Sequence, residues 1–93
     1  MTESDLIERT RTLVHQARLP PTIGLGSTWI IVLAASPRLP PVAAERYEAA
    51  FKEYRDLFPQ DVADFPHVQR RQTTRYLLLR AGSPAVAHWL SRH

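Results

Sequence analysis

The chain contains no cysteine and no long apolar run. The lack of cysteine excludes a disulfide framework, a thiolate zinc site and a cysteine nucleophile, and it leaves the redox compartment undetermined. No stretch approaches the roughly 18 consecutive apolar residues of a membrane span, and the acidic start of the chain lacks the apolar core of a secretory signal. We therefore expect a cytoplasmic protein that does not enter a membrane.

Acidic residues are missing from the last third of the chain. Residues 67–93 hold five arginines and no acid, which gives a net charge of +5, whereas residues 42–66 carry −3 and residues 1–41 carry +1. The overall charge of +3 hides this separation. Charge asymmetry of this kind bears on partners and solubility rather than on fold.

The size and composition predict one small folded domain over residues 1–93. Of the 93 residues, 44% are hydrophobic and 23% are charged. These values are ordinary for a globular domain and argue against disordered, collagen-like or low-complexity classes. A chain of this length has room for a single hydrophobic core.

Hydrophobic periodicity predicts three helices and two strands. Apolar residues recur three and four positions apart over 3–18 and over 42–58, where the second helix is acidic on its outer face. Aromatic and β-branched residues between turn signals predict a buried strand over 28–34 and a second strand over 73–80. Ser83 and Pro84 introduce a closing helix over 85–91.

This order predicts an α+β fold of helix, strand, helix, strand and helix. Residues 59–72, with mixed polarity and two prolines, are expected to form a connection. The strand–helix–strand unit would suit a right-handed crossover between parallel strands. Two strands make a thin sheet, so we expect either one further strand or completion of the sheet in a homodimer.

An all-α fold is the alternative, because residues 70–80 also suit a helix. Residues 79–92 loosely resemble the turn and recognition helix of helix-turn-helix repressors, with Gly82 and Ser83 followed by Val86 and the Trp89–Leu90 pair. The interval between Gly82 and Val86 is shorter here than in that motif. The resemblance would imply a DNA-binding C-terminus.

Several local patterns have both a functional and a structural interpretation. Gly24 and Gly26 precede a strand, whereas phosphate-binding loops follow a strand and open a helix, so a nucleotide site is disfavoured. The two prolines Pro37 and Pro40 suit a polyproline ligand, but we interpret them as the start of the next helix. The aromatic residues Tyr47, Phe51 and Tyr54 lie on one helix face, as in a core or a ligand-stacking surface.

The sequence contains no catalytic or metal-binding signature. No nucleophile frame of the Gly-x-Ser-x-Gly type occurs, and His88 and His93 are too few for a metal site. His67 lies near Asp61 and Asp64 in sequence only, which is weak support for an acid–base pair. We therefore expect no cofactor and favour a non-enzymatic protein over an enzyme.

The basic C-terminal third is the candidate partner-binding surface. Clustered arginines with an aromatic residue among them are typical of nucleic-acid binders. The alternative is that these arginines neutralise the acidic helix of this chain or of a second copy. The candidate residues are Arg70, Arg71, Arg75, Tyr76, Arg80, His88 and Arg92.

Three functions remain open from sequence. The first is a small regulatory module that binds nucleic acid or an acidic protein through this basic surface. The second is a protein-interaction module, such as an inhibitor, antitoxin or adaptor, that does not touch nucleic acid. The third is a small-ligand domain or an accessory subunit of an enzyme, which would use the aromatic helix face.

Overall fold

The computed structural model describes residues 1–20, 28–37 and 41–93 as an α+β fold. The glycine loop at residues 24–26 and Pro40 lie outside the described residues. Along the chain the elements are α1 (Glu3–Ala17), β1 (Trp29–Ala35), α2 (Pro41–Leu57), β2 (Val62–Gln69), β3 (Gln72–Arg80) and α3 (Pro84–Arg92). The three helices and the two predicted strands are confirmed, and a third strand is added.

The three strands form an antiparallel sheet in the order β1-β3-β2. The expected parallel crossover is therefore wrong, because β1 and β3 are adjacent and antiparallel. The helix-turn-helix alternative is wrong as well, since α3 follows a strand rather than a helix. No helix among the described residues is long and apolar enough to cross a membrane.

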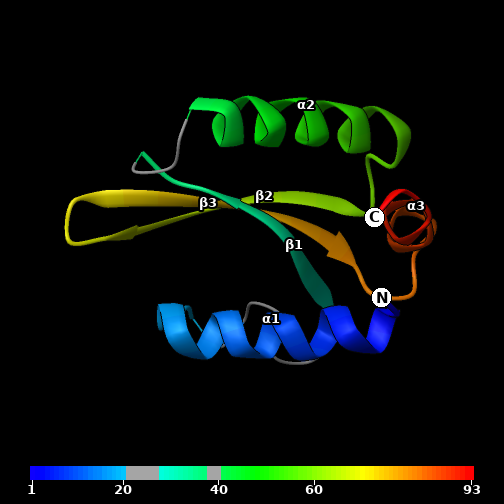
Figure 1. Cartoon of the computed structure of the whole chain (residues 1–93), viewed down its shortest axis with the longest axis horizontal. Coiled ribbons are helices and arrows are strands. Elements are labelled where there is room, and N and C mark those ends of the chain that lie inside the picture. Colours follow the sequence, from blue (N-terminus) through cyan, green and yellow to red (C-terminus); the bar gives the residue numbers. More distant parts are fainter. Residues whose placement is uncertain (21–27, 38–40) are drawn as a thin grey trace.

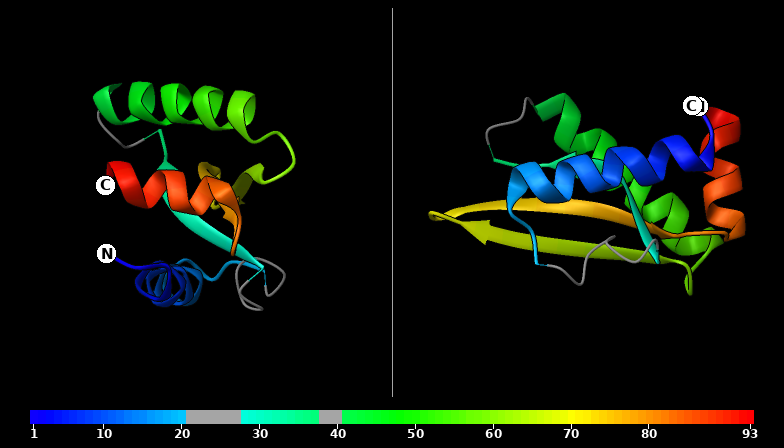
Figure 2. Two further views of the ribbon diagram at one scale, coloured as in Figure 1. Left: turned by 90° about the vertical axis from the view of Figure 1, so that its right-hand side faces the viewer. Right: turned by 90° about the horizontal axis from the view of Figure 1, so that it is seen from below.

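Helices cover both faces of this sheet. Figure 1 shows α2 over one face and α1 under the other, with α3 at the end of the sheet where β3 finishes, and the turned views agree (Figure 2). Strand β3 lies in the middle, and its residues Tyr76–Leu79 are all buried. Leu77 and Leu79 pack in a cluster with residues of α2 and α3 and with Leu6 of α1, whereas Tyr76 and Leu78 pack in a second cluster with Val14 of α1.

Strand β1 is an edge strand whose outer edge is partly covered by α1. Its pairing with β3 shifts register between Ile31 and Leu33, which marks a β-bulge at Val32. The buried Thr10 hydroxyl of α1 accepts a hydrogen bond from the Ile31 N–H at 2.9 Å. This bond fixes α1 against the edge and satisfies a backbone donor that would otherwise be buried without a partner.

Strand β2 forms the opposite edge and replaces the connection expected over residues 59–72. Sequence reasoning missed it because Pro66 interrupts the pattern. Proline is tolerated on edge strands, where its missing N–H faces away from the ladder. The chain itself supplies the third strand of the sheet. A two-stranded sheet was the reason to expect a homodimer, and that reason no longer applies.

A two-residue turn, Arg70 and Arg71, joins β2 to β3. Gln69 pairs with Gln72, and both arginines have positive φ, 50° and 66°. A type I′ hairpin turn requires positive φ at both central residues and is usually built from Asn-Gly. The tip of this hairpin projects beyond the ends of α1 and α2 (Figure 1), so the strained residues lie at an exposed extremity.

We expect the combined substitution Arg70→Asn and Arg71→Gly to raise the free energy of unfolding by about 1 kcal/mol. Left-handed conformations cost residues with a β-carbon about 1–2 kcal/mol each. Urea unfolding followed by circular dichroism measures the change. As a control, Lys52→Gly in the exposed interior of α2 is expected to lower stability by about 1 kcal/mol. Equal or lower stability of the turn variant would contradict the assignment of strain.

Candidate functional site

The structure does not gather the seven predicted partner-binding residues into one surface. Arg70 and Arg71 lie at the hairpin tip, whereas Arg80 ends the same hairpin at its far end and His88 and Arg92 lie on α3. Arg75 lies between these regions and faces α2. The basic third is therefore divided into an ion-paired part and an exposed tip.

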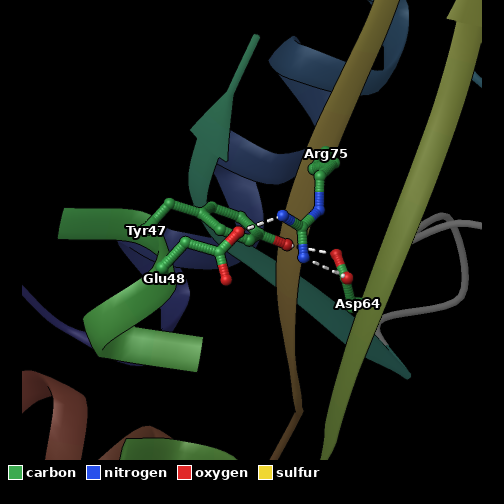
Figure 3. Close-up of polar contacts among 4 residues, drawn as sticks. All are labelled: Tyr47, Glu48, Asp64 and Arg75. Atoms are coloured by element: carbon green, nitrogen blue, oxygen red, sulfur yellow. Dashed lines mark hydrogen bonds and ion pairs between the residues drawn. The ribbon is translucent and has the colours of Figure 1, made fainter. Parts of the chain in front are cut away.

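Arg75 joins the hairpin to α2 through two carboxylates (Figure 3). Its guanidinium donates to Asp64 Oδ2 at 2.7 Å and to Glu48, and its Cζ lies 4.8 Å from the centre of the Tyr47 ring. The Tyr47 hydroxyl donates to the other oxygen of Asp64. One carboxylate thus holds both a buried tyrosine and an arginine.

Electrostatics within this cluster keep Tyr47 neutral and Arg75 charged. Burial raises the pKa of Tyr47 far above its ordinary value of 10.0, and the hydrogen bond to Asp64 adds to the effect. The hydrogen bond to Asp64 likewise raises the pKa of Arg75. Because these groups satisfy one another, we interpret the cluster as a structural link between α2 and the sheet rather than as an acid–base site.

Two further arginines of the basic third are also paired with the acidic middle segment. Arg80 Nε lies 3.2 Å from Asp61 Oδ1. Arg80 Cζ lies 4.8 Å from the centre of the Trp29 ring, so the guanidinium stacks over that ring. Arg92 of α3 pairs with Glu53 of α2, and His88 Nε2 lies 3.5 Å from the same carboxylate. Arg75, Arg80 and Arg92 thus neutralise acids of the same chain, as the alternative interpretation of the sequence expected.

The proposed acid–base pairing of His67 has no geometric support. Asp64 is occupied by Tyr47 and Arg75, and Asp61 is paired with Arg80. Among residues 1–20, 28–37 and 41–93, no group of three or more His, Asp or Glu side chains converges as metal ligands would.

Tyr76 lies in the core, with 5% of its surface exposed. It pairs across the sheet with Phe65 and packs in the α1-side cluster. Burial raises its pKa. Its ring is therefore not accessible for stacking on a base unless the core opens. Tyr76 belongs to the candidate surface predicted from sequence because it lies between arginines in the chain.

Arg70 and Arg71 are exposed and form no ion pair with any described residue. Beside them, the face of the hairpin on the α1 side carries a row of polar side chains next to a cavity of about 320 Å³. That cavity also reaches the C-terminal end of α1. Its lining consists of Ala17, His67, Gln69, Arg70, Gln72, Thr74 and Tyr76.

Sequence reasoning missed the polar row because it treated residues 59–72 as a connection. Once β2 is recognised, His67 lies opposite Thr74 and Gln69 lies opposite Gln72. Residues two apart on a strand share a face, so these four side chains line one side of the ribbon. Residues 62–69 do not alternate between apolar and polar types, and Pro66 argues against a strand, so the sequence pattern did not predict this face.

Comparison of the chain with protein-family models, with curated proteins and with solved structures finds no significant match.

Tyr47 should make the stability of the protein fall as the pH rises above 10.0. A tyrosine whose pKa is raised by folding stabilises the native state below its unfolded pKa, and the contribution is lost as the pH rises toward the folded pKa. Replacing Tyr47→Phe should therefore reduce the alkaline decline by up to about 1.4 kcal/mol per pH unit.

Urea unfolding at several alkaline pH values tests this. Near neutral pH the Tyr47→Phe variant should be less stable by about 1 kcal/mol, because the hydrogen bond to Asp64 is lost. Its stability curve should then approach that of the wild type as the pH increases. Parallel curves would show that ionisation of Tyr47 does not oppose the folded state.

Proposed function

We propose that this protein is a non-catalytic nucleic-acid-binding module whose contact element is the tip of the β2–β3 hairpin. The observation that carries the proposal is the position of Arg70 and Arg71, which are exposed at a projecting turn without an ion-pair partner among the described residues. Arg75, Arg80 and Arg92 contribute less, because acidic side chains already neutralise them.

The chemistry of the tip fits a phosphate backbone. Residues 67–74 contain two arginines and no acid. Arginine presents a planar fork of donors that matches phosphate oxygens, and it remains charged at any physiological pH. The amide of Gln69 and the hydroxyl of Thr74 add hydrogen-bonding groups beside it.

The shape of the hairpin also suits duplex DNA. A two-stranded β-ribbon fits into the major groove of B-form DNA, whereas the deep, narrow major groove of A-form RNA does not admit side chains. The strained turn is a further argument, because left-handed conformations at residues other than glycine are concentrated at functional sites. Asn-Gly would form the same turn with less strain but without the charge.

Removing the two tip charges should weaken DNA binding and its dependence on salt. We expect the double variant Arg70→Gln and Arg71→Gln to bind a fluorescent DNA duplex at least about tenfold more weakly at low salt. The plot of log affinity against log salt concentration has a negative slope, and the magnitude of this slope should decrease by about 1.8, which is about 0.9 for each lost phosphate contact. Fluorescence anisotropy at several salt concentrations measures both quantities.

The double variant Arg11→Gln and Arg55→Gln is a matched control. It removes the same charge from exposed positions on α1 and α2, where each arginine lies beside an acid, Glu8 and Asp56 respectively. It should leave the salt slope nearly unchanged. Equal losses in the two double variants would indicate an effect of net charge alone. If the wild type does not bind DNA even at low salt, the proposal fails and an acidic protein becomes the stronger candidate.

A further inference from the structure

A second cavity, of about 370 Å³, lies away from the hairpin tip along the outer edge of β1. The left view of Figure 2 shows α2, α3 and α1 one above the other, with β1 crossing between α1 and α2. The cavity contacts α1, β1, α2 and α3. Since α1 and α2 cover opposite faces of the sheet, a space that reaches both of them and β1 must lie at the edge of that strand.

The floor of this cavity is apolar and aromatic. Val32 and Leu33 both line it, because the β-bulge turns two successive residues of β1 toward the same core cluster. Ala50 and Tyr54 of α2 and Trp89 of α3 complete the floor. Pockets of about 300–1,000 Å³ with predominantly apolar walls are typical of small-molecule sites.

The rim of the cavity is positively charged. Arg9, Arg46 and Arg92 line it together with a single acid, Glu53, which pairs with Arg92. Arg9 and Arg46 make no ion pair within the part of the chain that the structure describes. Two guanidinium groups from different helices therefore border the same space without a neutralising partner.

The hydroxyl of Tyr54 is buried beneath the floor of the cavity. Tyr54 is 1% exposed, and its hydroxyl has no hydrogen-bond partner among the described residues. Burial raises the pKa of Tyr54 to about 12, so at neutral pH this group is a hydrogen-bond donor. Buried polar groups usually have a partner; Ser83 Oγ is a second exception among the described residues, and it does not line this cavity.

We propose that this cavity binds a small organic anion with a planar aromatic body and a carboxylate group. Arg9 and Arg46 would hold the carboxylate, because the guanidinium fork matches its two oxygens. The aromatic body would lie on the partly exposed Leu33 and Ala50, above the buried rings of Tyr54 and Trp89. The pocket differs from the hairpin cavity, whose lining is mostly polar, so the two sites suit different ligands.

Titration with naphthoate, followed by heteronuclear NMR of the isotope-labelled full chain, tests the proposal. The two tryptophans provide internal reporters, since Trp89 lines the cavity and Trp29 lies under Arg80 at the start of β1. Saturable shifts are expected for the Trp89 indole N–H and for amides of residues that line the cavity, and the Trp29 indole should move little. The neutral amide of the same acid should bind at least about tenfold more weakly.

Matched arginine variants identify the groups that hold the carboxylate. Arg46→Gln and Arg9→Gln should each weaken naphthoate binding by about tenfold and leave binding of the neutral amide unchanged. Arg55→Gln on α2 and Arg11→Gln on α1 are the controls and should bind naphthoate as the wild type does. All four positions are exposed, and circular dichroism verifies that each variant folds.

The Tyr54→Phe variant is a control for the buried part of the cavity floor. It should fold at least as stably as the wild type, because it removes a buried hydroxyl that has no partner among the described residues, and it should bind naphthoate as the wild type does, because Arg9 and Arg46 hold the carboxylate. The proposal is overturned if naphthoate gives no saturable shifts at this cavity. It is also overturned if the neutral amide binds equally well or if the arginine variants match their controls.

Discussion

The burial of β3 on both faces is the constraint on which the rest of the structure depends. A central strand with four consecutive buried residues, Tyr76–Leu79, needs a strand on each side and a helical layer on each face. The two neighbouring strands supply hydrogen-bond partners, and α1 and α2 cover the apolar side chains. Strands covered on both sides have continuous rather than alternating hydrophobicity, as residues 76–79 do.

The separation of charge along the chain has a structural role in this arrangement. The acidic segment forms α2 and most of β2, and the basic segment forms β3 and α3, which pack beside them. The ion pairs Arg75–Asp64, Arg80–Asp61 and Arg92–Glu53 all join the two segments. Surface ion pairs individually contribute little to stability, so these pairs together give a modest preference for this arrangement of elements.

The helices were predictable because their apolar periodicity is local. Strand β1 was predictable for the same reason, since its aromatic and β-branched run is bounded by turn signals. Strand β2 was not, because an edge strand with Pro66 in its centre and Asp64 facing α2 has neither alternation nor a continuous apolar run. Its identity depends on pairing with β3 and on the Tyr47–Arg75 contacts, which are distant in sequence.

The candidate site could be predicted only in part for a related reason. A count of arginines identifies the basic third, but it does not show which charges are neutralised within the fold. Arg70 and Arg75 are equivalent in a sequence window, yet one lies at an exposed turn and the other between Glu48 and Asp64. Only the pairing of β2 with β3 distinguishes them.

Four local features of the described residues depart from the usual preferences. The arginine pair occupies a turn that prefers Asn-Gly, Arg18 has a positive φ of 53° at the end of α1, and the hydroxyls of Tyr54 and Ser83 are buried without a partner among the described residues. Sequences that specify a fold satisfy local preferences nearly everywhere, and the exceptions are concentrated where function is located. Two of these exceptions lie at the proposed sites, the arginine pair at the hairpin tip and Tyr54 under the cavity beside the edge of β1. Since a macromolecule would contact the tip and a small anion would enter the cavity, the fold has room for a binding surface and a separate ligand site.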